Sequence, residues 1–206
     1  MKNLFILTML MIVACTFTKA QETSTTEKAW DFSPEVNFYF MQDDFFMLPV
    51  IKADKNKLHL EARYNYEDRE TFSAWAGYNF TGGNELEYTI TPMLGAIVGS
   101  SNGIAPGLEF TFTYKSFELY TEAEYLFDTD SGESNFYYQW SEITWSPKDW
   151  LWVGISGQRT RLYQTDLAIQ RALLIGGSYK SLELTGYVYN LGFDAPFVQL
   201  SLSASF

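Results

Sequence analysis

The chain ends in FVQLSLSASF, residues 197 to 206, and its apolar and polar side chains alternate without a break from Val198 to Phe206. Successive side chains of a β-strand point to opposite faces, so this segment predicts a strand with one apolar and one polar face. The apolar face carries Val198, Leu200, Leu202, Ala204 and Phe206. The polar face carries Gln199, Ser201, Ser203 and Ser205.

A strand of this kind that ends on a carboxy-terminal aromatic residue resembles the closing strand of bacterial outer-membrane β-barrels. In that class the terminal aromatic residue, here Phe206, is part of the signal that the barrel assembly machinery reads. The resemblance implies a location in the outer membrane of a Gram-negative bacterium, in contact with outer-membrane lipid and lipopolysaccharide. It covers a class of proteins and names no particular solute.

The amino-terminal segment predicts export. Lys2 precedes an apolar run from Leu4 to Phe17, and small residues at Thr18 and Ala20 suit a signal peptidase, so residues 1–20 are interpreted as a cleaved signal peptide. The apolar run is shorter than the roughly 20 residues that a spanning helix needs, which argues against a membrane anchor. The signal resembles those common among Bacteroidota.

Cys15, the single cysteine, leaves an alternative open. Residues 12–15 read Ile-Val-Ala-Cys and resemble a lipobox, in which the cysteine is lipidated and becomes the first mature residue. If cleavage instead follows Ala20, the mature chain has no cysteine and forms no disulfide.

Charge and composition narrow the function. Removal of Lys2 and Lys19 with the signal leaves 12 basic against 25 acidic residues, which argues against nucleic acid as a partner. Aromatic residues make up 18% of the chain, which suits a membrane barrel better than a soluble domain. The mature sequence contains no segment with the length and hydropathy of a spanning helix, so membrane residence must be by strands.

Turn signals divide the chain into segments of roughly ten residues after a polar periplasmic leader at 21–32. Eleven breaks in the barrel domain, 33–206, predict twelve strands. They fall at 42–44, 54–56, 67–70, 81–84, 100–104, 115–116, 128–135, 146–149, 160–165, 179–180 and 190–196. The last seven connections alternate between long and short, which places both ends of the barrel in the periplasm.

These features predict an all-β fold, a single antiparallel up-and-down transmembrane β-barrel of about twelve strands. Pro49 does not suit the interior of a strand, so a ten-stranded barrel with a long early loop is the alternative. A soluble calycin-like barrel is a further rival, which would place apolar residues inside and charged residues outside.

Alternation within the strands predicts which side chains face the lumen. It is clearest at 57–66, where Leu58, Leu60, Ala62, Tyr64 and Tyr66 would face lipid. Arg171 falls on a face with apolar residues, which suggests a bulge in its strand. The predicted pore-lining residues are His59, Glu61, Arg63, Glu85, Glu87, Glu109, Glu118, Glu122, Glu124 and Glu183. Trp75, Tyr120, Tyr187 and Tyr189 would narrow the bore.

Acidic residues outnumber basic ones in this lumen, which favours a narrow passive channel for small hydrophilic solutes with a preference for cations. The alternative is a closed structural or interaction barrel with a salt-bridged lumen. An outer-membrane hydrolase centred on His59 is a third hypothesis, but no motif supplies its nucleophile, so we expect no enzyme. No cofactor or metal is expected. Arg159 and Arg161, near the external rim, could contact lipopolysaccharide phosphates.

Deletion of Phe206 tests the interpretation of the carboxy terminus. We expect the shortened chain to insert poorly into the outer membrane, because the assembly machinery reads the terminal aromatic residue. The fraction of heat-modifiable, folded protein in isolated outer membranes measures the effect. Normal insertion without Phe206 would contradict the prediction.

Overall fold

The computed structural model describes residues 29–130, 135–160, 169–193 and 195–206, and within them every regular element is a strand. The predicted signal peptide, Cys15 and most of the leader lie outside the described residues. No helix in the described part of the chain is long and apolar enough to cross a lipid bilayer. The strands are β1 (Asp31–Phe40), β2 (Phe45–Lys55), β3 (Leu58–Tyr64), β4 (Thr71–Tyr78), β5 (Phe80–Gly83), β6 (Leu86–Gly99), β7 (Gly103–Tyr114), β8 (Phe117–Asp128), β9 (Phe136–Lys148), β10 (Leu151–Arg159), β11 (Gln170–Tyr179), β12 (Leu182–Tyr189) and β13 (Phe197–Ala204).

The strands form one closed antiparallel barrel. Apart from β4 and β5, which both pair with β6, each strand pairs with its neighbours in the chain, and β1 pairs with β13, which closes the sheet. Gly77 of β4 faces Met93, and Phe80 of β5 faces Ile90 in the same register. β4 and β5 are therefore one strand interrupted at Asn79, and the predicted twelve strands are confirmed. The ten-stranded alternative is wrong.

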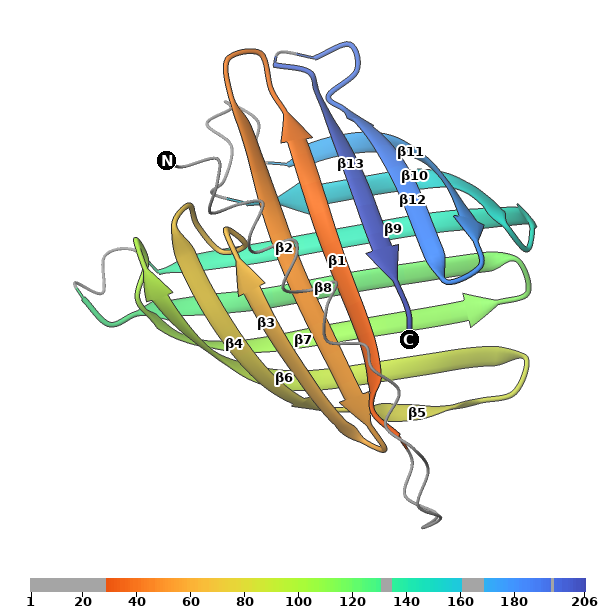
Figure 1. Cartoon of the computed structure of the whole chain (residues 1–206), viewed down its shortest axis with the longest axis horizontal. Coiled ribbons are helices and arrows are strands. Elements are labelled where there is room, and N and C mark those ends of the chain that lie inside the picture. The colour runs from red at the N-terminus through yellow and green to blue at the C-terminus, as the bar shows by residue number, and fades with distance from the viewer. Residues whose placement is uncertain (1–28, 131–134, 161–168, 194) are drawn as a thin grey trace.

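Asn79 lies at the interruption, and its polar groups bond to the β2–β3 hairpin and to β6. Its backbone N–H donates to the carbonyl of Lys57 at 2.8 Å. Its side chain donates to Asp54 at 2.6 Å and accepts from Thr91 at 2.6 Å. Beyond this point β5 pairs with β6 alone, so the two strands continue as a ribbon past the β2–β3 hairpin (Figure 1).

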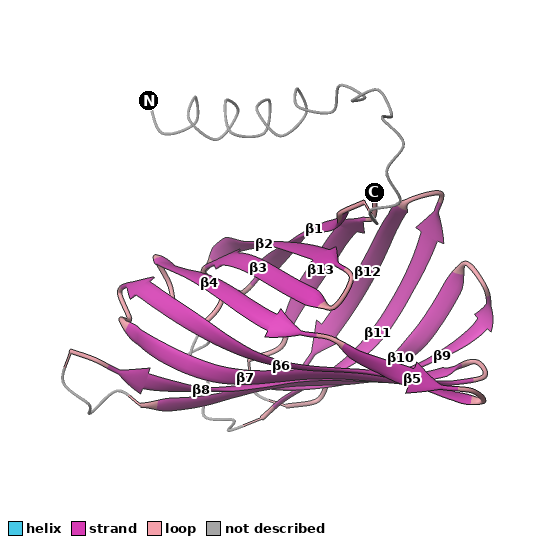
Figure 2. Cartoon of the chain, turned by 90° about the horizontal axis from the view of Figure 1, so that it is seen from below, coloured by secondary structure: helices cyan, strands magenta, loops and turns pink. Residues whose placement is uncertain are grey.

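The barrel is flattened rather than round. In Figure 2, β1 to β4 and β13 form one face and β6 to β9 form the other. Figure 1 shows the strands of the first face crossing in front of those of the second at a large angle. Side chains from opposite faces can therefore meet in the lumen. In a round barrel of twelve strands the bore would be too wide for most of these contacts.

The prolines within strands occupy gaps in the hydrogen-bonded ladders. Pro49 pairs with Val36 of β1, but the ladder between β2 and β3 begins only at Val50. Its missing N–H therefore leaves no bond unmade on that side, and β2 tolerates a residue that we expected to break it. Pro34, Pro92, Pro106 and Pro147 likewise lie where the ladder to one neighbouring strand is interrupted or has ended.

The outer face of the barrel is apolar, and buried polar and charged side chains lie in its interior, which is the reverse of a soluble calycin-like barrel. In β13, Val198, Leu200 and Leu202 are exposed, whereas Gln199 is fully buried. The same alternation recurs around the barrel, as predicted. Exposed aliphatic residues include Leu58, Leu94, Val98, Ile104, Ile143, Ile155, Leu173, Ile175, Leu182, Leu184, Val188, Leu200 and Leu202.

Two predicted orientations are wrong. Tyr66 is buried inside instead of facing lipid, because β3 ends at Tyr64 and the positive φ of Asn65 (59°) ends the alternation there. The bulge expected near Arg171 is absent, since β11 keeps an unbroken register with both neighbours. Arg171 instead lies exposed at one end of its strand, with its guanidinium 5.5 Å from the ring centre of Phe193.

The two ends of the barrel differ. The start of β1 and the carboxy terminus meet at one end, where the backbones of Phe32 and Phe206 bond to each other. Two-residue turns join the strands at this end, which we call the turn end. Longer connections, such as 41–44 and 65–70, lie at the opposite loop end. β1 begins at Asp31, two residues earlier than the sequence suggested.

A matched pair of substitutions tests the lipid-facing surface. Ile175 is 59% exposed on the outer face within β11, and Tyr179 is 73% exposed on the same strand, beside the turn. We expect Ile175→Arg to cost about 2 to 4 kcal/mol of folding free energy in a bilayer, and Tyr179→Arg about 0 to 1 kcal/mol. Reversible unfolding of the refolded barrel in lipid vesicles measures both. Equal costs at the two depths would contradict the predicted membrane position.

Candidate functional site

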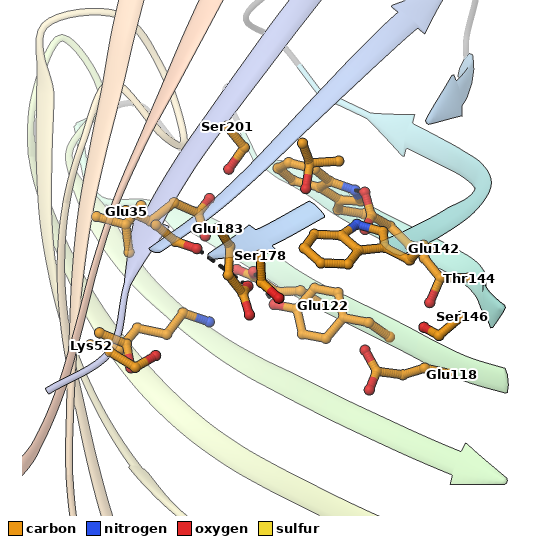
Figure 3. Close-up of a pocket in the computed structure, with 18 of the residues that line it drawn as sticks. Glu35, Lys52, Glu118, Glu122, Glu142, Thr144, Ser146, Ser178, Glu183 and Ser201 are labelled. Carbon is orange, nitrogen blue, oxygen red and sulfur yellow. Dashed lines mark hydrogen bonds between the residues drawn. The ribbon is translucent and has the colours of Figure 1, made fainter. Parts of the chain in front are cut away.

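A polar cavity of about 570 Å³ lies inside the barrel and reaches the turn end. We call it the vestibule (Figure 3). Its wall includes seven acidic side chains, Glu35, Glu61, Glu118, Glu122, Glu142, Asp149 and Glu183. Only three basic side chains line it, Lys52, Arg63 and Lys115. The vestibule is therefore acidic.

Arg63 lies at the inner limit of the vestibule and is 1% exposed. Its Nε donates to Glu61 at 2.6 Å, and its Nη1 lies 2.5 Å from Glu122 and 3.1 Å from Glu124. Arg63 comes from β3, whereas Glu122 and Glu124 come from β8 on the opposite face. These ion pairs consequently cross the lumen and tie the two faces together.

Aromatic rings hold the guanidinium of Arg63 in place. Its carbon lies 4.4 Å from the ring centre of Tyr66 and 4.6 Å from that of Trp75, both within cation–π range. The indole of Trp75 fits because Gly95 and Gly107 have no side chain: an added Cβ would approach it to 2.5 Å and 2.8 Å, respectively. The two glycines thus create the space in which Trp75 packs.

Lys52 and His59 extend this network. The ammonium of Lys52 lies 2.6 Å from Glu109 and 3.4 Å from Glu61. The His59 ring contacts Asp54 through Nδ1 at 2.9 Å and Glu61 through Nε2 at 2.6 Å. We call the set Lys52, Asp54, His59, Glu61, Arg63, Glu67, Glu109, Glu122 and Glu124 the Arg63 cluster.

Tyrosine hydroxyls connect the Arg63 cluster to other strands. Tyr66 donates to Glu122 at 2.7 Å and accepts from Tyr138 of β9 at 3.1 Å. Tyr138 in turn accepts from Gln158 of β10 at 3.3 Å. Tyr120 donates to Glu109 at 2.9 Å. The network therefore reaches from β2 to β10 through the interior.

Glu67 belongs to the connection between β3 and β4, which turns into the lumen. Its carboxylate accepts from Ser73 at 2.6 Å and from the Trp75 indole at 3.2 Å, and Arg63 lies 4.0 Å away. Burial raises the pKa of Glu67 above its usual range, although Arg63 and its hydrogen bonds oppose that shift.

The loop end of the lumen is filled by a block of aromatic side chains, Tyr39, Phe46, Tyr189 and Phe197. The rings of Tyr39 and Phe46 stack at 4.5 Å, and those of Tyr189 and Phe197 stack at 4.5 Å. All four side chains are buried. In the described residues, this aromatic block and the Arg63 cluster together fill the lumen beyond the vestibule.

Most of the predicted pore-lining residues lie inside the barrel. His59, Glu61, Arg63, Glu109, Glu122 and Glu124 gather in the Arg63 cluster, and Glu118 and Glu183 line the vestibule. Glu87 lines a separate shallow pocket formed near the β5–β6 ribbon. Glu85 does not line the interior: it lies exposed in the two-residue turn before β6, where strand alternation no longer applies.

The sequence analysis missed several interior residues. Lys52 follows an apolar stretch that contains Pro49, and this stretch shows no two-residue alternation from which the direction of the Lys52 side chain could be predicted. Glu142 lies in β9, whose inward-facing Tyr138 and Trp140 are aromatic while its outward-facing Gln139 and Ser141 are polar. Gln139 donates to Ser141 at 3.0 Å on that outer face, which satisfies both groups but hides the alternation. Only the register with β8 and β10 reveals which residues of β9 point inward.

His59, Glu61 and Glu109 could together hold a metal ion, since one ligand atom from each lies within 4.8 Å of the others. The ammonium of Lys52 already lies against both carboxylates, however, so a cation is supplied by the chain itself. Both ring nitrogens of His59 contact carboxylates, Asp54 through Nδ1 and Glu61 through Nε2, and neither of these contacts is to a hydroxyl group.

Comparisons with known proteins agree with this fold. No protein-family model and no curated protein matches the chain in sequence. Among solved structures, a KdgM porin is similar, with a TM-score of 0.62, 16% identity, and 84% of this chain aligned to 99% of the porin. A KdgM porin in complex with disordered oligogalacturonate has a TM-score of 0.60, 14% identity and the same coverage. The chain shares the barrel fold of these porins.

Removal of the Arg63 charge tests the ion pairs that cross the lumen. We expect Arg63→Gln to lower the free energy of unfolding by about 3 to 5 kcal/mol, because it leaves Glu122 and Glu124 buried without their cation and leaves Glu61 with Lys52 and His59 only. Urea unfolding in vesicles, followed by tryptophan fluorescence, measures it. The control is Arg159→Gln, at an exposed position, with an expected change within about 0.5 kcal/mol. Equal midpoints for the two variants would contradict the assigned role.

Proposed function

We propose that the protein is an outer-membrane barrel that forms a porin-like channel with an acidic lumen. One observation carries the proposal: an acidic vestibule lies inside a closed barrel whose outer face is apolar. The fold shared with KdgM porins supports it. The interior offers carboxylates and hydroxyl groups, which suit hydrated solutes better than apolar ones.

The charge of the vestibule argues for a different solute from that in the similar porin complex. Oligogalacturonate is a polyanion, and the seven carboxylates of the vestibule would repel it. Small cationic or neutral hydrophilic solutes fit this wall better. The fold is therefore compatible with transport, while the side chains on its inner face set the charge preference.

Passage across the barrel requires movement of side chains. The Arg63 cluster and the aromatic block fill the lumen beyond the vestibule, so a solute must displace or pass them. This filling favours a second candidate function, a closed structural or interaction barrel whose ion pairs hold its two faces together. The two functions differ in a direct observable, which is ion conductance.

We also propose contacts with lipopolysaccharide. Arg159 and Arg171 lie exposed near the loop end of adjacent strands, and Arg159 lies 5.8 Å from the ring centre of Tyr137. Two guanidinium groups on the outer face at this height could bind the phosphates of the outer leaflet. Arg161, the other expected contact, lies outside the described residues.

Planar-bilayer recording of the refolded protein tests the channel. We expect small conductance steps whose reversal potential under a salt gradient indicates a preference for cations, because carboxylates line the entrance. The double variant Glu118→Gln, Glu183→Gln should shift the reversal potential towards zero by removing two of those charges. Neither group has an ion pair among the described residues.

The matched control is Glu85→Gln, which removes the same charge from an exposed turn outside the vestibule and should leave the reversal potential unchanged. Silence from protein shown to be folded and inserted would overturn the channel and favour the closed barrel. Preference for anions would contradict the acidic entrance.

A further inference from the structure

The acidic groups of the vestibule differ in whether a basic side chain lies beside them. Glu61 and Glu122 are neutralised by Lys52 and Arg63 at the inner limit. Glu35 and Glu142 have no ion pair among the residues that the structure describes. They come from β1 and β9, which lie on different faces of the barrel. Figure 3 shows Lys52 on the side of the vestibule opposite Glu142.

Neutral groups bind these two carboxyl groups and supply no counter-ion. Glu142 accepts a hydrogen bond from the Trp140 indole at 2.8 Å. Glu35 accepts one from Asn37 at 2.5 Å. Each carboxyl group is therefore oriented by neutral side chains, and no basic side chain of the described residues forms an ion pair with it.

Aromatic surfaces lie next to the Glu142 carboxylate. Trp140 packs against Tyr187 edge to face, with ring centres 6.0 Å apart, and both line the vestibule. Trp152 also lines it and packs closely over Gly176, where an added Cβ would approach the indole to 2.2 Å. A carboxyl group beside aromatic rings suits an organic cation, because the charge can be met by the acid and the attached carbon chain by the rings.

Size favours an organic ligand over a metal ion. A volume of about 570 Å³ is within the range of small-molecule sites, roughly 300 to 1,000 Å³. Hydroxyl groups of Thr144, Ser146, Ser178 and Ser201 on the surrounding wall can accept hydrogen bonds from an ammonium group. Two carboxylates on different strands suit a ligand with two separated positive charges.

We propose that the vestibule binds a small alkyl diammonium cation between Glu35 and Glu142, with its chain against Trp140 and Trp152. Such cations would be the solute class of the proposed channel, and this assignment rests on the proposed function. Binding itself needs no passage through the lumen, so it can be measured separately.

Calorimetric titration of the full chain, refolded in detergent micelles, tests the site. The probe is 1,6-diaminohexane, and hexane-1,6-diol is its uncharged analogue. We expect saturable binding of the diamine and none of the diol. Glu142→Gln and Glu35→Gln should each weaken binding about tenfold or more, because each removes one carboxylate of the pair. Glu85→Gln, with the same loss of charge outside the vestibule, should bind like the original protein.

A second variant separates the aromatic contribution from general charge. Trp152→Leu keeps an apolar side chain over Gly176 but removes the ring, and it should weaken diamine binding several-fold with Glu35 and Glu142 intact. Equal binding by Glu142→Gln and the original protein would overturn the proposal. So would complete competition by Mg²⁺ at matched ionic strength, because it would show that the carboxylates bind a divalent cation without any contribution from the rings.

The two proposals can fail separately. Diamine binding by a barrel that conducts no ions would support the site and overturn the channel. Cation-selective conductance without diamine binding would support the channel and overturn the site.

Discussion

The buried guanidinium of Arg63 is the interaction on which the interior of this barrel depends. It joins carboxylates from its own strand and from β8 on the opposite face, and two aromatic rings enclose it. A cation in this position allows several carboxylates to be buried close together, since each would otherwise repel the others. The flattened shape and the charged lumen are consequently linked, because the guanidinium on one face pairs with carboxylates on the other where the two faces approach.

The same arrangement divides the lumen into a filled part and a hollow part. At the loop end, stacked aromatic rings exclude water, while at the turn end the carboxylates of the vestibule outnumber the basic groups. A barrel that only needed stability could pair or omit the unpaired acids Glu35 and Glu142. In the proposed binding of a diammonium cation, these two acids, in a cavity lined by tryptophans, connect the fold to recognition of the ligand.

Much of the fold could be predicted from the sequence, because lipid imposes the same requirement on every outward-facing residue. Two-residue alternation in β13 and the turn signals gave the twelve strands. Prediction failed at two places where the alternation of inward and outward residues changes without a signal in the sequence. At Asn65 a positive φ turns Tyr66 inward. In β9 the inward residues are aromatic and the outward ones polar, which inverts the usual pattern. Pro49 suggested a break in its strand because the sequence does not show that the ladder between β2 and β3 begins only at Val50, which leaves the missing N–H of Pro49 without a partner to lose.

The sequence by itself determined a closed antiparallel barrel, since two-residue alternation and turn signals are local and cumulative. Only the tertiary structure decided which charges meet. Lys52 reaches Glu109 across 57 residues of sequence, and Arg63 reaches Glu124 across 61, contacts that depend on strand register and on the flattening of the barrel. Those long-range contacts neutralise one set of carboxylates and leave Glu35 and Glu142 without a cation, because burial and pairing are set by distance in space.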